Sequence, residues 1–368
     1  MRFICPQKIL MHGISIVQKS VSTKTTLPIL KGIYLEASAS KLKLVGTDLE
    51  IGIENIIEAE VLEEGSVVID ARLLGEIIRK LPDADVEFSL LENNQLKIKC
   101  ENSEFNILSL SPNEFPELPV IEEEEAYKIP QELFRNMIKQ TVFSTSQDES
   151  RPILTGVLME IEKDILNMVA LDGYRLALRK GKIESSYNYK VVIPAKTLNE
   201  VSRIMNIDED EPIHIVLTDN HTLFTIGNTK LISRLLEGEF INYKQILPKE
   251  HKSRVKTSTR NLLNSIERAS LLAKEGKNNL VKFIIKDEVM TITSNSELGK
   301  VHEEIPIALE GADLEIAFNS KYFIDALKVI DDEEVYLDFT TNISPGILKP
   351  VSNEHYVYLV LPVRVASN

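Results

Sequence analysis

The residues with the clearest chemical potential lie in the segment LDGYR, residues 171–175, where an aspartate stands three positions before an arginine. A guanidinium beside a carboxylate can hold it ionised, which is the state that a nucleophile or a general base requires. Asp48 stands at the matching place in an earlier copy of the same pattern, and Asn295 stands there in a later one. Such recurrence is typical of a turn in which the side chain hydrogen-bonds its own backbone. We therefore interpret Asp172 as a turn former and keep a catalytic role as the alternative.

The other reactive residues match no strong catalytic or metal-binding motif. The six histidines are scattered at spacings that indicate no metal site. The sequence contains no glycine-rich phosphate loop, HExxH, Cys-x-x-Cys or G-x-S-x-G. The only cysteines, Cys5 and Cys100, each lie in an apolar alternating stretch, which predicts buried free thiols. These absences favour a function other than catalysis.

The elements that must position Asp172 are repeated along the chain. A constant offset of 124 residues relates Pro28, Ile29, Leu30 and Asp48 to Pro152, Ile153, Leu154 and Asp172. A fainter third copy starts at Asn278 and keeps two hydrophobic strands and a polar turn. A chain of 368 residues therefore divides into three related domains. Their expected bounds are 1–122, 127–249 and 253–366.

Each copy is expected to hold two helices and about eight short strands, an α+β fold in which antiparallel sheets carry helices on one face. Apolar residues at helical spacing predict helices within 7–20, 71–80, 130–141, 195–205, 260–274 and 319–330. Alternating apolar and polar residues predict strands, among them 29–36, 51–61 and several within 153–179. The segments 115–130 and 247–259 are interpreted as linkers between copies.

Charge is distributed unevenly between the helices and the rest of the chain. The six predicted helices sum to +9, which leaves −23 for the remainder of a chain whose net charge is −14. Basic helices on an acidic body are expected if the helices face one polyanion. Alternatively, helices merely carry lysine and arginine on solvated faces. No run approaches the roughly 20 apolar residues of a membrane helix, and the N-terminal residues lack signal-peptide zones, so we expect a cytoplasmic protein.

A second candidate site surrounds the middle copy of the pattern. Its residues are Arg151, Leu154, Tyr174, Arg175, Leu176, Ile241, Gln245 and Ile246. The C-terminal segment 359–364 is as apolar as a core strand, but Pro362 cannot donate to a ladder and favours an edge of a sheet. An apolar edge has to be covered. Two interpretations stay open, which are ordinary core packing and a groove that binds a peptide.

These segments together resemble the bacterial sliding clamp family, the beta subunit of DNA polymerase III. The resemblance covers essentially the whole chain and rests on TLPIL, GTDLE, RPIL, LDGYRLAL, EFINYKQILP and LPVRV. It implies the DNA clamp fold, with three topologically similar domains in each chain and a head-to-tail homodimer that closes into a six-domain ring around duplex DNA. Such a ring would be a non-catalytic processivity factor of DNA replication that needs no cofactor and no metal.

The resemblance also implies partners and site residues. The partners would be double-stranded DNA, held topologically without sequence preference, the DNA polymerase III alpha subunit, the clamp loader complex and other proteins with a clamp-binding motif, but no membrane. The partner-peptide groove would comprise Arg151, Leu154, Leu171, Gly173, Tyr174, Arg175, Leu176, Ile241, Gln245, Ile246, Ile343, Pro345, Leu359, Val360, Leu361, Pro362, Val363 and Arg364. The DNA-facing residues would be Lys24, Arg72, Arg79, Lys80, Lys139, Lys196, Arg203, Arg260, Arg268 and Lys328.

The dimer interface implied by the resemblance would place Phe105 and Ile107 of one chain against Leu271 and Leu272 of the other. The alternative is that all four residues belong to domain cores. Two other function classes also remain open from the residues alone. One is a hydrolase or transferase built on Asp172, and the other is a monomeric repeat scaffold that shares the three copies but not the ring.

Overall fold

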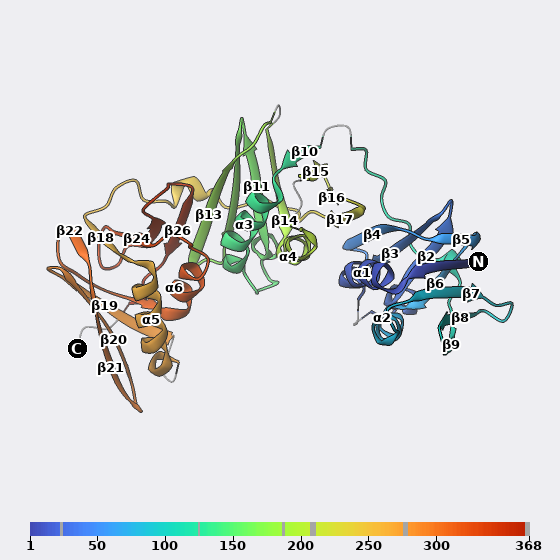
Figure 1. The fold of residues 1–368 in the computed structure, drawn as a ribbon. Helices are drawn as coiled ribbons and strands as arrows, with labels where there is room; N and C mark the ends of the chain where they lie inside the picture. The colour runs from blue at the N-terminus through green and yellow to red at the C-terminus, as the bar shows by residue number, and fades with distance from the viewer. Residues whose placement is uncertain (23–24, 124–125, 186–187, 207–210, 275–278, 365–368) are drawn as a thin grey trace. The chain divides into compact units, whose positions relative to one another are not determined.

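The computed structural model describes residues 1–22, 25–123, 126–185, 188–206, 211–274 and 279–364. The chain folds into two compact units, each of which makes most of its contacts within itself (Figure 1). The first unit holds residues 1–131 and 200–235, and the second holds residues 132–199 and 236–368. Helices and antiparallel sheets make up both units, so the predicted α+β class is confirmed.

All six predicted helices are present in the described residues. They are α1 (Gln7–Val17), α2 (Ala71–Lys80), α3 (Gln131–Thr141), α4 (Ala195–Ile204), α5 (Thr259–Ala273) and α6 (Ser320–Leu327). Helix α2 illustrates why they form where they do. The Asp70 side chain caps its start by accepting a hydrogen bond of 2.8 Å from the Leu73 amide, Leu74 and Ile78 are fully buried, and the helix ends before Pro82.

The first unit contains two antiparallel sheets. One has the strand order β5-β1-β7-β8-β9 and the other has the order β10-β15-β16-β17-β4-β3-β2-β6. Their bounds are β1 (Arg2–Pro6), β2 (Gly32–Ser38), β3 (Lys41–Thr47), β4 (Ile51–Glu58), β5 (Glu60–Glu63), β6 (Gly65–Asp70), β7 (Asp85–Leu90), β8 (Gln95–Cys100), β9 (Ser103–Leu108), β10 (Tyr127–Ile129), β15 (Ile213–Leu217), β16 (His221–Ile226) and β17 (Thr229–Arg234).

The second unit also contains two antiparallel sheets, of order β14-β11-β12-β13-β26-β25-β24-β18-β22 and β21-β20-β19-β23. Their bounds are β11 (Gly156–Glu162), β12 (Ile165–Leu171), β13 (Arg175–Lys182), β14 (Tyr189–Pro194), β18 (Ser253–Ser258), β19 (Leu280–Lys286), β20 (Val289–Ser296), β21 (Gly299–Pro306), β22 (Ala308–Gly311), β23 (Leu314–Asn319), β24 (Glu334–Phe339), β25 (Gly346–Pro350) and β26 (Tyr356–Val360).

The larger sheets of the two units correspond strand by strand. Reading β6-β2-β3-β4-β17-β16-β15-β10 against β14-β11-β12-β13-β26-β25-β24-β18 pairs every strand of the first sheet with a counterpart, and the second sheet has β22 in addition. The register agrees as well, because Gly52 lies opposite Ile232 in the first unit and Leu176 lies opposite Leu359 in the second. The middle copy of the repeat therefore gives β10 and β15–β17 to one sheet and β11–β14 to the other.

Several local predictions were wrong. The residues Pro28–Lys31 and Pro152–Thr155 are 3-10 turns rather than the starts of strands. Proline leads each turn because its fixed φ suits the first helical position and its missing amide is not needed there. Both predicted linkers contain a strand. Linker 115–130 contains β10, which pairs with β15, and linker 247–259 contains β18, which lies between β24 and β22. The C-terminal strand β26 is central rather than an edge, because it ends at Val360 before Pro362 and pairs on both sides.

The cysteine prediction is confirmed, because Cys5 and Cys100 are both free and buried. Burial raises the pKa of the Cys5 thiol to about 11, and burial also raises the pKa of Cys100. Both side chains therefore stay protonated and pack as small apolar groups near neutral pH. In the part of the chain that the structure describes, no helix is long and apolar enough to span a membrane.

Candidate functional site

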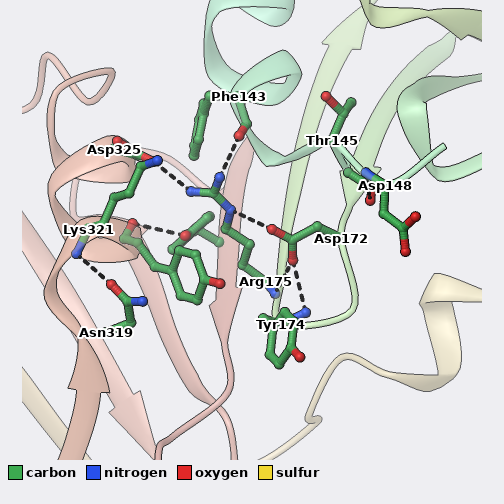
Figure 2. A network of polar contacts seen from close by, with 12 residues as sticks. Phe143, Thr145, Asp148, Asp172, Tyr174, Arg175, Asn319, Lys321 and Asp325 are labelled. Atoms are coloured by element: carbon green, nitrogen blue, oxygen red, sulfur yellow. Dashed lines mark hydrogen bonds and ion pairs between the residues drawn. The ribbon is translucent and has the colours of Figure 1, made fainter. Parts of the chain in front are cut away.

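Arg175 is the centre of a polar network in the second unit (Figure 2). Its side chain is only 8% exposed, and its nitrogens bind two carboxylates and one carbonyl. Nε donates to Asp172 Oδ2 at 3.0 Å, Nη1 donates to Asp325 Oδ2 at 2.7 Å, and Nη2 donates to the Phe143 carbonyl at 2.7 Å. A guanidinium with this many charge-assisted partners is held in one position.

Aromatic rings frame the same guanidinium. Its carbon lies 4.7 Å from the centre of the Tyr322 ring and 5.4 Å from that of Phe143, both within cation–π range. Tyr174, which is 61% exposed, stacks on Tyr322 with ring centroids 6.4 Å apart. Burial disfavours a charged Arg175, but Tyr358, Asp325 and Asp172 outweigh burial and raise the pKa of its guanidinium. Arg175 is therefore a permanent buried cation that links α6, β13 and the segment after α3.

Asp172 forms the turn that the sequence predicted. Its Oδ1 accepts the amides of Tyr174 at 2.9 Å and Arg175 at 3.0 Å, and Gly173 takes the left-handed φ of 94°. Asp48 does the same in the first unit, accepting the amides two and three residues ahead of it at 3.0 and 2.8 Å. The turn-former interpretation is confirmed, and Asp172 has the added role of holding Arg175. Asn295 differs, because it lies within β20.

The residues expected in the groove separate into a buried floor and an exposed rim. Leu154, Leu171, Leu176 and Leu359 are at most 3% exposed and belong to one hydrophobic cluster. For these four, the core interpretation describes their packing. The rim residues are solvent-facing, with exposed fractions of 61% for Tyr174, 44% for Ile241, 39% for Ile246, 67% for Ile343 and 38% for Leu361.

The remaining predicted groove residues lie around this floor or next to Arg175. Val360 is fully buried opposite Arg175 and belongs to a different cluster, Gly173, Gln245 and Arg364 are exposed, and Pro345, Pro362 and Val363 are half-buried. The tail is fixed by backbone hydrogen bonds of 2.8 Å from Leu361 N to the Tyr174 carbonyl and from Val363 N to the Ala317 carbonyl. A hollow of about 620 Å³ contains Arg151, Tyr174 and Arg175 from the prediction.

The same hollow contains residues that were not among the predicted site residues. Phe143, Tyr322 and Asp325 line it, and all three contact Arg175. Asp325 is 150 residues from Arg175 in the chain and belongs to no motif. The available signal was weak, namely a carboxylate in the middle of the predicted helix 319–330 of the third copy. Among the described residues, no group of three or more histidine, cysteine or acidic side chains could hold a metal ion.

The basic residues expected to face DNA are exposed wherever the structure describes them. They are Arg72, Arg79, Lys80, Lys139, Lys196, Arg203, Arg260, Arg268 and Lys328. Lys24 lies outside the described residues. Several already have acidic neighbours, including Arg72 with Glu76 at 2.9 Å and Lys328 with Glu267 at 2.9 Å. Such exposed ion pairs are weak, so they leave these side chains able to rotate toward a phosphate.

The residues expected at the dimer interface lie at surfaces rather than in cores. Phe105 is 37% exposed and Leu271 is 66% exposed, while Ile107 and Leu272 are half-buried. Strand β9, which carries Phe105 and Ile107, ends its sheet, and β21 ends a sheet of the second unit. The core alternative is therefore wrong for Phe105 and Leu271.

We expect Arg175→Met to destabilise the second unit by about 3 kcal/mol. The change removes the buried cation and leaves Asp172 and Asp325 without their shared partner, which is the costly way to break a buried ion pair. Thermal unfolding followed by circular dichroism measures the effect. The matched control is Arg268→Met, which removes an exposed pair with Glu303 and should cost less than about 1 kcal/mol. Equal losses in the two variants would contradict the structural role of Arg175.

The fold and this site define a class of protein, the clamps built from repeated α+β domains. Family descriptions of the DNA polymerase III beta subunit match the chain in order, with the N-terminal domain over residues 1–119, the central domain over 128–242 and the C-terminal domain over 244–364. The beta sliding clamp of Bacillus subtilis is 41% identical over 377 residues, covering 99% of this chain and 100% of the relative.

Two further comparisons agree. The beta sliding clamp of Halalkalibacterium halodurans is 40% identical over 379 residues, covering 99% of this chain and all of the relative. The crystal structure of the Bacillus subtilis clamp matches with a TM-score of 0.97 over 100% of both chains at 40% identity. This chain belongs to the beta sliding clamp family, the DNA polymerase III beta subunits, and consists of three clamp domains.

Proposed function

We propose that this chain is a sliding clamp, a non-catalytic processivity subunit that closes head-to-tail with a second copy around duplex DNA in the cytoplasm. The ring tethers the polymerase to its template, so that the enzyme rebinds the primer end faster than it diffuses away. The proposed domain bounds are 1–122, 127–249 and 253–366. The ring itself breaks no bond, so it requires no cofactor.

The observation that carries this proposal is that the chain has two unpaired sheet edges, one in each unit, with exposed apolar residues beside them. Strand β9 ends the β5-β1-β7-β8-β9 sheet, and β21 ends the β21-β20-β19-β23 sheet. Apolar side chains are exposed beside both edges, with Leu108 at 79% and Leu298 at 74%. Unpaired edges with apolar neighbours require a cover. A head-to-tail contact between β9 of one chain and β21 of the next, used twice, closes a two-chain ring.

The groove is proposed to bind short linear motifs of partner proteins. Four buried leucines form its floor, and the exposed rim residues Tyr174, Ile241, Ile246, Ile343 and Leu361 offer apolar contacts to a peptide. Arg151 and Gln245 are exposed polar groups that can contact a peptide backbone. The partners proposed for it are the polymerase alpha subunit, the clamp loader and other proteins that carry a clamp-binding motif.

The proposed DNA contacts are phosphate contacts without base readout. The candidate residues are Lys24, Arg72, Arg79, Lys80, Lys139, Lys196, Arg203, Arg260, Arg268 and Lys328. Contacts to phosphates position a protein on DNA without sequence information, and exposed basic residues of this kind allow sliding. Because a closed ring is held by its topology, the individual contacts can be weak.

Retention on DNA of different topology tests the proposal. The clamp is loaded onto nicked circular DNA by its loader and washed with high salt, and the circle is then cut. We expect retention on the circle and release from the linear form, because a ring slides off a free end. The control is a clamp of known function loaded by the same loader. Equal loss from both forms, with the control retained, would favour a monomeric scaffold.

A further inference from the structure

The first unit contains a counterpart of the groove that is filled by its own chain. Residues 112–121, which we call the first strap, follow β9, and residues 114–119 within it correspond to residues 239–248, the second strap. Both corresponding segments start with Glu-Phe and end with Leu-Pro, as Glu114-Phe115 and Leu118-Pro119 in the first and Glu239-Phe240 and Leu247-Pro248 in the second. The second strap has four more residues between these pairs.

The floor of the counterpart follows from the strand register. Leu176 lies opposite Leu359 and Leu359 lies opposite Ile347 in the second unit. Gly52 lies opposite Ile232 and Ile232 lies opposite Leu223 at the same places in the first unit. At two of these three positions both units have an apolar residue, while at the third Gly52 of the first unit corresponds to Leu176 of the second.

Leu118 of the first strap fills the space that this glycine leaves. A Cβ added to Gly52 would lie 2.3 Å from Leu118 Cδ2, and the three atoms nearest to it all belong to the Leu118 side chain. Leu118 packs with Leu223 and Ile232 in one hydrophobic cluster. Phe115, three residues before Leu118, also holds the first strap, because its ring stacks on Tyr34 with centroids 5.5 Å apart.

The first strap, which has four fewer residues between Glu-Phe and Leu-Pro, also lacks the rim. Ile241 and Ile246, two exposed rim residues, lie in the part of the second strap that has extra residues. In the first unit, a hollow of about 590 Å³ lies between the strap and the sheet and is lined by Phe115, Leu118 and Ile121 on one side and by Leu223 and Ile232 on the other. The strap thus spans a cavity large enough for a peptide while its leucine takes the apolar position.

We propose that the first strap is the resident occupant of a second docking groove, with Leu118 as its apolar anchor, so that each chain offers only one open groove. The occupant is residues 112–121 of the same chain. Displacing the strap exposes a groove for a leucine-bearing peptide in the first unit. The inferred site is separate from the groove of the second unit. It rests on the proposed function only in that the groove of the second unit is proposed to bind peptides.

A peptide supplied in trans tests the proposal. The probe is a fluorescein-labelled synthetic decapeptide with the sequence of residues 112–121, and the proteins are the full chain and its Leu118→Ala variant. Because Leu118→Ala empties the anchor position, we expect the variant to bind the probe at least about tenfold more tightly than the natural chain, the ratio expected for burying one leucine side chain. A probe with alanine at the Leu118 position should lose this gain. Fluorescence anisotropy measures both affinities.

Three further variants separate the proposal from its alternatives. Adding Gly52→Ala to Leu118→Ala should abolish the gain, because the new methyl group takes the space that the leucine of the probe must fill. Val120→Ala is the control, because Val120 is 96% exposed and should leave binding unchanged. Adding Leu176→Arg to Leu118→Ala should preserve the gain if the probe binds the first unit. Loss of the gain on adding Leu176→Arg, or equal affinity of Leu118→Ala and the natural chain, would overturn the proposal.

Discussion

Leu271→Glu should convert the protein from a dimer into a monomer of 41.6 kDa and abolish its retention on circular DNA. Leu271 is 66% exposed in the single chain, on the last turns of α5, and the proposed junction would bury it against Phe105 and Ile107 of the second copy. Burying an unpaired carboxylate in an apolar contact costs several kcal/mol. Because the ring uses the same junction twice, one substitution damages both.

Sedimentation equilibrium at micromolar concentration measures the change in mass. The matched control is Val289→Glu, an exposed apolar residue of β20 that is 41% exposed. Val289 and Ser296 are the two ends of β20, about 23 Å apart along the strand. Leu298 of the proposed junction follows the Ser296 end, so Val289 is at the end of the strand away from it. The control should stay dimeric. A Leu271→Glu chain that also stays dimeric would place the junction elsewhere.

Leu176→Arg should abolish binding of a partner polymerase peptide, with a loss of at least about a hundredfold, while the chain stays dimeric. Leu176 is 2% exposed and forms the groove floor with Leu359. An arginine there can only avoid burying its charge by extending its side chain into the groove. The guanidinium would then lie where the apolar anchor of the peptide must dock, so both shape and polarity would exclude it.

Fluorescence anisotropy with the labelled peptide measures this loss, and unchanged affinity would contradict the groove assignment. Ile165→Arg provides the control, since it makes the same change at a position of the same sheet that is 47% exposed. Tyr174→Ala adds a variant without a buried charge. Because Tyr174 is 61% exposed, its truncation should lower the affinity for the peptide without lowering the unfolding temperature of the protein.

The repeat and the helices could be predicted because they depend on local patterns. The stripe that includes Leu74 and Ile78 fixes α2, and the constant offset between the copies anticipates the strand-by-strand agreement of the larger sheets. The segments that begin Pro28-Ile-Leu and Pro152-Ile-Leu consist of apolar, β-prone residues, a pattern that predicts strands. Their 3-10 geometry follows from proline at the first position, which overrides that propensity.

The site was predictable only where its residues lie in the repeated pattern. Tyr174, Arg175 and Leu176 follow the Asp172 turn, so the sequence could point to them. The partners Phe143 and Asp325 could not be found in this way, because their approach to Arg175 depends on the packing of α6 and of the segment after α3. Burial of Arg175 is likewise a result of tertiary packing. From the sequence alone an arginine is expected at the surface, because arginines are seldom buried unless they are paired.

The sharing of sheets between copies means that the chain cannot lose one repeat and remain a smaller protein of the same kind. If the chain were cut after residue 122, β4 would lose its ladder with β17, in which Ile51 to Asn55 pair with Ser233 to Thr229. The exposed edge would be long and apolar, a form that promotes aggregation. The ladder between β13 and β26 joins the second copy to the third in the same way, so the loss of any one copy would leave an unpaired sheet edge in another.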